Sequence, residues 1–197
     1  MGRTTRTAGS WLAAAALAAT QLLTVQPTAG ETGAMAKFTL TSSDFTDGGT
    51  LATAQVFNGF DCKGGNVSPG LKWSGAPAGT KSFALLVHDP DAPTGSGWWH
   101  WLAYNIPAGT TSLPAGAGDP KKNLMPAGVV QGRTDYGTVG YGGPCPPPGK
   151  PHRYQFRLYA LKVAKLEVPA DASAALIGFN ARAQELGHAE LTGLYGR

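Results

Sequence analysis

The sequence has few charges, few cysteines and no repeated segment, and each shortage excludes a class of protein. Charged residues make up 14% of the 197 residues, too few for a disordered chain or a charged coiled coil. The formal net charge is +4, but lysines and arginines are scattered singly, so nothing suggests nucleic-acid binding. The sequence also lacks a low-complexity linker, and we therefore expect one domain after the N-terminal segment.

Only two cysteines are present, and neither Cys62 nor Cys145 has a cysteine neighbour at zinc-ligand spacing. In an oxidising compartment the two are expected to form a disulfide with each other. The GxSxG motif of many hydrolases is absent as well. We therefore expect a protein without enzymatic activity, cofactor or metal. A hydrolytic or metal-dependent enzyme that uses histidine and carboxylate side chains stays open as the alternative.

The N-terminus is typical of an exported protein. Arg3 and Arg6 form a basic start, and the apolar run from Trp11 to Leu23 is too short to span a membrane. This pattern predicts a signal peptide over residues 1–36, cleaved near residue 30 or 36, and a periplasmic or secreted location. The alternative is that translation starts at Met35 and gives a cytosolic protein.

The remaining residues, 37–197, are long enough for one domain with its own core. With 28 glycines and 15 prolines in the chain, turn chemistry punctuates short apolar runs, which predicts a mainly β fold of antiparallel sheets. The predicted strands are Lys37 to Thr41, Leu71 to Ser74, Ser82 to Asp89, Trp99 to Ile106, Arg153 to Val163, and a short one near Glu190 to Tyr195.

Alternation of side chains predicts which strand is central and which residues share a face. Both faces of Ser82 to Asp89 are apolar, so this strand should lie inside a sheet, with Asp89 and His88 on opposite faces. In the next strand, one face should carry Trp98, His100, Leu102, Tyr104 and Ile106. In a third strand, one face should carry His152, Tyr154, Phe156 and Leu158.

One helix is predicted near the C-terminus. Asp171 or Ser173 can cap its start, and Gly187 can end it. The apolar stripe that we expect to pack on a sheet consists of Ala172, Ala175, Leu176, Phe179, Ala183 and Leu186.

Three segments concentrate histidine, aspartate, tryptophan and proline at predicted strand ends: DPDAP at 89–93, GWWHW at 97–101 and YGGPCPPPGKPHRY at 141–154. Proline fixes φ and removes a donor, so these segments favour rigid pocket walls. His100 and His152 can each donate an N–H to an oxyanion, while Asp89 or Asp91 accepts the other ring proton. Backbone N–H groups near Gly143 and Cys145 would complete an anion cradle.

These segments resemble the signature regions of the phosphatidylethanolamine-binding protein family, in its bacterial Raf kinase inhibitor-like branch. NGFDCKGGNVSPGLKW at 58–73 and RTDYG at 133–137 also fit, and the likeness covers nearly the whole of 37–197. The resemblance implies Greek-key-type antiparallel sheets with a few peripheral helices and a surface pocket for small anions. By motif match, the pocket residues are Asp89, Pro93, Trp98, His100, Cys145, Pro146, His152 and Tyr154.

The likeness also has two departures. Better-known animal members carry a second histidine where this chain has Trp99, and a rim glycine is replaced by Cys145. Head-group selectivity is therefore not carried over. Kinase inhibition is not carried over either, because the protein is expected to be exported. The function we expect is capture of a small anionic or phosphorylated ligand, such as a phospholipid head group, with modulation of a protein partner, in a monomer or homodimer without a membrane span. A protein inhibitor that acts through its surface is a further alternative.

Overall fold

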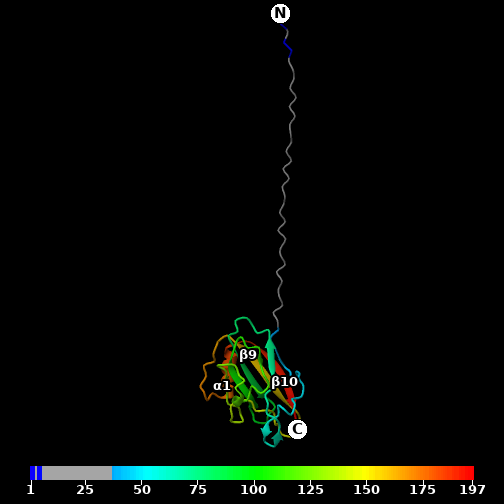
Figure 1. Cartoon of the computed structure of the whole chain (residues 1–197), viewed down its shortest axis with the longest axis vertical. Coiled ribbons are helices and arrows are strands. Elements are labelled where there is room, and N and C mark those ends of the chain that lie inside the picture. The colour runs from blue at the N-terminus through cyan, green and yellow to red at the C-terminus, as the bar shows by residue number, and fades with distance from the viewer. Residues whose placement is uncertain (3, 6–36) are drawn as a thin grey trace. The chain divides into compact units, whose positions relative to one another are not determined.

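The computed structural model of the chain describes residues 1–2, 4–5 and 37–197 (Figure 1). The apolar run and both cleavage positions of the predicted signal peptide lie outside these ranges. No helix among the described residues has the length and apolar character needed to cross a membrane.

A five-stranded antiparallel sheet, in the order β10-β9-β5-β6-β8, forms the centre of the fold. Its strands are β5 (Ser82–Asp89), β6 (Trp98–Pro107), β8 (Val130–Gln131), β9 (His152–Leu161) and β10 (Glu185–Tyr195). The prediction that β5 is central is confirmed, since it pairs with β6 on one side and β9 on the other. Burial of both its faces requires the continuous apolar run seen in its sequence.

A three-stranded antiparallel sheet covers one face of the large sheet. It contains β1 (Thr39–Ser42), β4 (Leu71–Ser74) and β7 (Ser112–Leu113) in the order β1-β4-β7. Side chains such as Trp73 of β4, Phe83 of β5 and Phe156 of β9 interlock between the two sheets in the main core. Two smaller elements lie outside these sheets. They are a hairpin of β2 (Asn58–Gly59) and β3 (Cys62–Lys63) and the 3-10 turn η1 (Pro120–Lys122).

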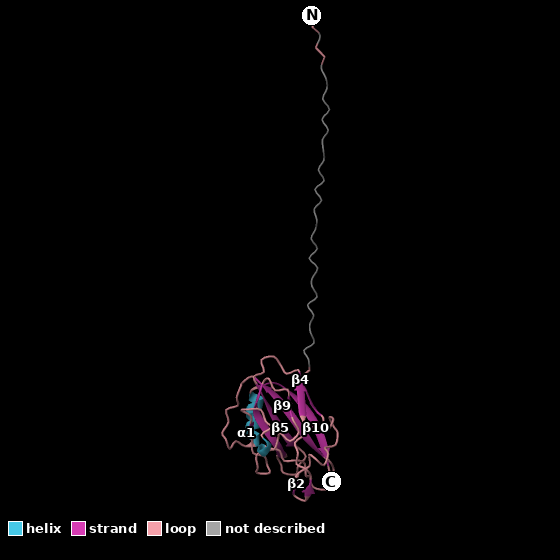
Figure 2. Ribbon diagram, viewed as in Figure 1, coloured by secondary structure: helices cyan, strands magenta, loops and turns pink. Residues whose placement is uncertain are grey.

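The helix α1 (Ala174–Ala183) lies along the other face of the large sheet (Figure 2). Its start at the Ser173 cap is as predicted, but its end is not, because the chain enters β10 at Glu185 before reaching Gly187. The predicted apolar stripe is also wrong. Phe179 is 71% exposed, and the helix instead buries a smaller set of side chains, Ala174, Ile177 and Ala181.

Small residues explain this choice of helix face. A side-chain carbon added at Gly178 would lie 3.3 Å from the Leu86 side chain of β5, so the helix approaches the sheet closely. On this face the small residues Ala174, Gly178 and Ala181 flank one large side chain, Ile177, whereas Leu176 and Phe179 lie on the outer side.

Two register shifts in β6 overturn the predicted single face of that strand. His88 pairs with Trp99 and Val87 with Trp101, so His100 is an extra residue, a β-bulge. The bulge places Trp101 in the main core, whereas Leu102 and Tyr104 lie in the second core under α1. A second shift beyond Ala103 returns Ile106 to the main core.

The other predicted strands agree with the structure apart from their ends, whereas the two-residue strands β2, β3, β7 and β8 were not predicted. The predicted face of β9 is correct, since Tyr154, Phe156 and Leu158 all lie in the main core. Strand β10 begins at Glu185, earlier than the predicted Glu190. Its early residues continue straight from the helix, and helix periodicity masked them in the sequence.

Candidate functional site

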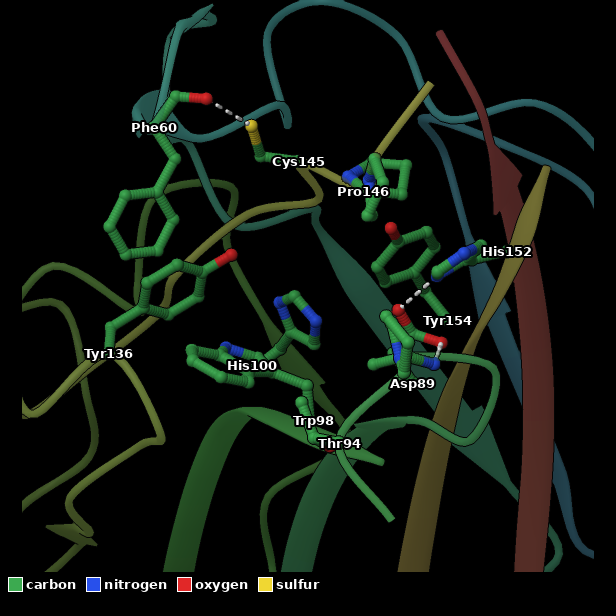
Figure 3. A pocket seen from close by; sticks show the side chains of 13 residues that line it. Phe60, Asp89, Thr94, Trp98, His100, Tyr136, Cys145, Pro146, His152 and Tyr154 are labelled. Carbon is green, nitrogen blue, oxygen red and sulfur yellow. Dashed lines mark hydrogen bonds and ion pairs between the residues drawn. The ribbon is translucent and has the colours of Figure 1, made fainter. Parts of the chain in front are cut away.

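The three proline-, histidine- and tryptophan-containing segments meet around one pocket of about 200 Å³. Figure 3 shows side chains of its 13 lining residues. These residues come from loops and strand ends at one end of the large sheet, where β5 finishes and β6 and β9 begin. All eight residues that the family likeness predicted lie here: Asp89, Pro93, Trp98, His100, Cys145, Pro146, His152 and Tyr154. The other five lining residues were not predicted as site residues from the sequence: Phe60, Ala92, Thr94, Tyr136 and Pro147.

Strand register explains why residues distant in the sequence meet. Asp89 ends β5 and pairs with Trp98, which begins β6. On the other side of β5, His88 pairs with Gln155. The first residues of β9, including His152 and Tyr154, therefore lie at the same end of the sheet. Antiparallel pairing therefore collects the end of one strand and the starts of its two neighbours.

Asp89 holds the turn after β5 and the ring of His152 in place. Its Oδ1 accepts the backbone N–H groups of Asp91 and Ala92 at 2.8 and 3.1 Å, which fixes the turn after β5. Its Oδ2 accepts the Nδ1–H of His152 at 2.8 Å, and both side chains are largely buried (Figure 3). The carboxylate is thus already engaged on both oxygens and acts as an orienter of the imidazole.

Asp91, the other carboxylate considered for this role, is engaged elsewhere. It accepts hydrogen bonds from the backbone N–H and the guanidinium of Arg153 at 2.6 to 2.9 Å. The hydrogen bond from the Arg153 side chain lowers the pKa of Asp91 to about 2. Asp91 is not a lining residue of the pocket, and it therefore anchors the loop from outside.

His100 is held by a backbone carbonyl, so the expectation that a carboxylate fixes its ring is wrong. The residue is 3% exposed, and its Nδ1 lies 2.7 Å from the carbonyl oxygen of Gly142. A carbonyl can only accept, so Nδ1 carries the proton. Burial lowers the pKa of His100 to about 4, although the bond to Gly142 and the charge of Asp89 act in the opposite direction. At neutral pH the ring is uncharged, with a lone pair on Nε2.

Buried polar atoms without partners are concentrated at this pocket. Among the residues that the structure describes, five buried side-chain polar atoms have no hydrogen-bond partner, and three of them belong to pocket residues. These three are Nε1 of Trp98, Nε2 of His100 and the hydroxyl of Tyr154. Burial raises the pKa of Tyr154, which keeps its proton. Leaving a buried polar group unpaired costs roughly 1–3 kcal/mol, so the cluster calls for a ligand that pairs with it.

An aromatic rim surrounds the pocket mouth. Tyr136 stacks on Phe57 with ring centroids 4.1 Å apart and donates its hydroxyl proton to the Gly143 carbonyl at 2.8 Å. The ring centroid of Phe60 lies 5.7 Å from that of Tyr136, and Phe60 is 63% exposed. Tyr136 belongs to the RTDYG segment, so the family likeness was the only sequence signal for it. Phe60 belongs to the segment 58–73, which the family likeness also covers, and the disulfide helps to hold its hairpin at the pocket.

The predicted disulfide between Cys62 and Cys145 is confirmed, with the two Cα atoms 6.0 Å apart. It ties the β2–β3 hairpin to the proline-rich wall. The carbonyl oxygen of Phe60 lies 3.2 Å from Sγ of Cys145, a contact without a shared proton because a disulfide sulfur carries none. The backbone cradle expected at Gly143 is wrong, since that N–H is donated to Oδ1 of Asn66 at 2.8 Å.

His88 and Trp99 lie on the other face of the sheet, away from the pocket. Their ring centroids are 4.2 Å apart, and Nε2 of His88 lies 3.0 Å from the Ser96 carbonyl oxygen. The position where animal members of the resembled family carry a second histidine thus does not line this pocket. Across the described part of the chain, no three histidine, cysteine, aspartate or glutamate side chains are grouped as metal ligands would be.

The chain is similar in sequence to known proteins. The sequence model of a family described as "Phosphatidylethanolamine-binding protein" matches residues 41–196. YbcL of Escherichia coli (strain K12) is 53% identical over 161 residues, which are 81% of this chain and 88% of YbcL. YbhB of the same organism is 48% identical over 156 residues, 79% of this chain and 98% of YbhB.

Solved structures show the same fold. The crystal structure of E. coli YbcL, described as a new member of the mammalian PEBP family, superimposes with a TM-score of 0.80 and covers 82% of this chain and 99% of YbcL. The structure of CT736 from Chlamydia trachomatis, described as a putative PEBP homolog, has a TM-score of 0.68 at 31% identity and covers 81% of this chain and 97% of CT736.

Proposed function

Since the chain belongs to the phosphatidylethanolamine-binding protein family, we propose that it is a binding protein that captures a small anionic or phosphorylated ligand in the pocket at Asp89, His100 and His152. One observation carries the proposal: Trp98, His100 and Tyr154 each bring a buried polar atom without a partner to one cavity. The acceptor oxygens of an oxyanion can pair with the N–H of Trp98 and the O–H of Tyr154, and a hydroxyl on the ligand can pair with Nε2 of His100.

The charges of the pocket are consistent with an anion. Asp89 is the single lining carboxylate, and its charge is offset by two backbone N–H groups and by the imidazole of His152. Tryptophan and tyrosine donors add hydrogen bonds without adding a competing anion. The apolar rim of Phe60, Tyr136 and prolines excludes water and suits a ligand with a short organic group attached to its anionic end.

Titration calorimetry with inorganic phosphate and with O-phosphoethanolamine tests this function. Trp98→Phe and Tyr154→Phe each remove one donor and keep an aromatic side chain, so each should weaken binding by roughly tenfold to a hundredfold, as for hydrogen bonds to charged groups. Tyr159→Phe is the matched control, because Tyr159 lies in the second core on the opposite face of the sheet. Equal affinities in all three variants and the parent protein would refute the pocket as the binding site.

We also propose that the protein is exported to the periplasm or secreted. The disulfide supports this, since disulfides persist mainly in oxidising compartments. N-terminal sequencing of the protein from fractionated cells tests the proposal: a start near residue 31 or 37 in the exported fraction supports it, and a start at Met35 in the cytosol contradicts it. Modulation of a protein partner remains a prediction.

A further inference from the structure

His100 presents the wrong polarity for an ordinary anion. Its Nδ1–H is donated to the Gly142 carbonyl at 2.7 Å, and the backbone N–H of Gly142 returns a hydrogen bond to the His100 carbonyl at 2.8 Å. This reciprocal pair fixes both the ring and its tautomer. The remaining nitrogen, Nε2, is buried without a partner, and in the neutral ring it is an acceptor.

The lone pair on Nε2 would therefore face the oxygen lone pairs of a bound oxyanion. Trp98 and Tyr154 can donate to such an oxygen, but His100 cannot do so unless a proton is added. The proton can arrive on the ligand, as the hydroxyl of a phosphate, or from water onto the imidazole. In both cases one proton lies between the ligand and the ring. The complex therefore contains one more proton than the fully deprotonated anion and the empty pocket together.

Nε2 of His152 also has a lone pair, because the Nδ1–H of that ring is donated to Asp89 at 2.8 Å, but this nitrogen is not one of the buried atoms without a partner, so water can pair with it. The other pocket groups cannot take this role. Both oxygens of Asp89 already accept hydrogen bonds, two at Oδ1 and one at Oδ2. The tyrosines that contact the imidazole, Tyr136 at 5.6 Å and Tyr154 at 5.0 Å between centroids, carry protons of their own. Of the three buried unpartnered atoms in this pocket, Nε2 of His100 is the one that has a lone pair and no proton.

We propose that the pocket binds its oxyanion together with one proton, held at Nε2 of His100, and therefore selects phosphate over sulfate at neutral pH. The inference rests on the proposed function and names its ligand class more narrowly. Inorganic phosphate near neutral pH keeps a hydroxyl that can donate to Nε2, whereas sulfate has none. A phosphomonoester acquires that hydroxyl below its second pKa, near 6, and a phosphodiester never has it.

The groups around His100 set the direction of the pH effect. Asp89 on β5 favours the charged ring, whereas burial and His88 on β5 oppose it, and the pKa is lowered to about 4. Tyr136, after β8, and Tyr154, on β9, stay neutral because burial raises their pKa. A proton-free anion must thus supply the free energy to protonate the ring, and its affinity rises as the pH falls.

Calorimetric titration with sulfate from pH 8 to pH 5.5, and with phosphate at pH 7.5, tests the inference. Phosphate should bind at least about tenfold more tightly than sulfate at pH 7.5, and sulfate should gain about tenfold per pH unit lost, as uptake of one proton requires. At pH 5.5, O-phosphoethanolamine should bind more tightly than the diester glycerophosphoethanolamine, which separates a free phosphomonoester from a lipid head group.

Two variants assign the proton to His100. In His100→Gln the side-chain amide can donate at any pH, so the preference for phosphate and the pH slope of sulfate should both disappear. In Tyr159→Phe, the matched control in the second core, both should remain. Sulfate binding within about threefold of phosphate at pH 7.5, or an unchanged slope in His100→Gln, would overturn the inference. If neither anion binds the parent protein at any pH, the proposed function itself is wrong.

Discussion

Removing the disulfide should strongly destabilise the protein without changing its folded structure. Cys62 and Cys145 are separated by 83 residues, and a cross-link of that length reduces the entropy of the unfolded chain by about 15 cal/mol/K in the chain-entropy relation. At 25 °C this corresponds to about 4.5 kcal/mol of stability. The double variant Cys62→Ala, Cys145→Ala should lose an amount of that order.

The native state has reason to survive the change. The β2–β3 hairpin stays attached through the stacked rings of Phe57 and Tyr136 and through the hydrogen bond from the Phe57 N–H to the Pro144 carbonyl at 3.0 Å. The effect should therefore arise in the unfolded chain, which becomes free to expand.

Urea unfolding followed by circular dichroism measures this loss. We expect unchanged native spectra, a lower midpoint and a steeper denaturant dependence, since an uncross-linked chain exposes more surface. The melting temperature should fall by about 9 to 18 °C for a domain of this size. The parent protein with a reductant should behave like the double variant. A loss below about 1 kcal/mol would refute the reasoning, because it would mean that the cross-link hardly restricts the denatured ensemble.

Three further predictions concern packing and charge. Gly143→Ala should destabilise by about 1–3 kcal/mol or prevent folding, because the added carbon would lie 1.9 Å from a backbone oxygen, whereas Gly109→Ala, with open space around it, should be nearly neutral in the same urea titration. Ile177→Ala should cost about 2–5 kcal/mol, since Ile177 is 1% exposed, and Phe179→Ala should stay within about 0.5 kcal/mol because Phe179 is 71% exposed; equal losses would contradict the observed helix face. Asp91→Asn should cost less than about 1 kcal/mol at pH 7, because the ion pair is partly exposed. The folded-state pKa of Asp91 lies below its ordinary value of 3.8, at about 2, so this stabilisation is present above pH 4 and declines towards pH 2. Chemical denaturation at pH 7 and near pH 2 should show that the stability difference between the parent protein and Asp91→Asn is smaller at the lower pH.

The fold class and most strands were predictable from the sequence because burial leaves a periodic trace. The run Ser82–Asp89 is apolar on both faces, and this pattern has one structural explanation, a strand in the middle of a sheet. The face of the strand His152–Leu161 was equally clear, because no register shift interrupts its pairing with the central strand.

The predictions failed where a local irregularity or a competing contact changed the periodicity. The extra residue at His100 moved Trp101 into the main core, and no residue type in GWWHW marks a bulge. In the helix, the pattern allowed either of two faces, and the buried one is the face where Gly178 lets the helix approach the sheet closely around Ile177. The C-terminal end of the helix was hidden because Leu186 continues the helical spacing although it lies in a strand.

The sequence by itself determined which residue types stand at strand ends, the likeness to a family and the pair of cysteines, since these depend on residue identity and local alternation. Only the tertiary structure decided which hydrogen-bond partner each imidazole has. Asp89 holds His152, but a carbonyl from the distant segment at Gly142 holds His100. That partner is a backbone carbonyl, which every residue has, so no residue type in the sequence indicates it. It nevertheless decides whether Nε2 of His100 donates or accepts a hydrogen bond.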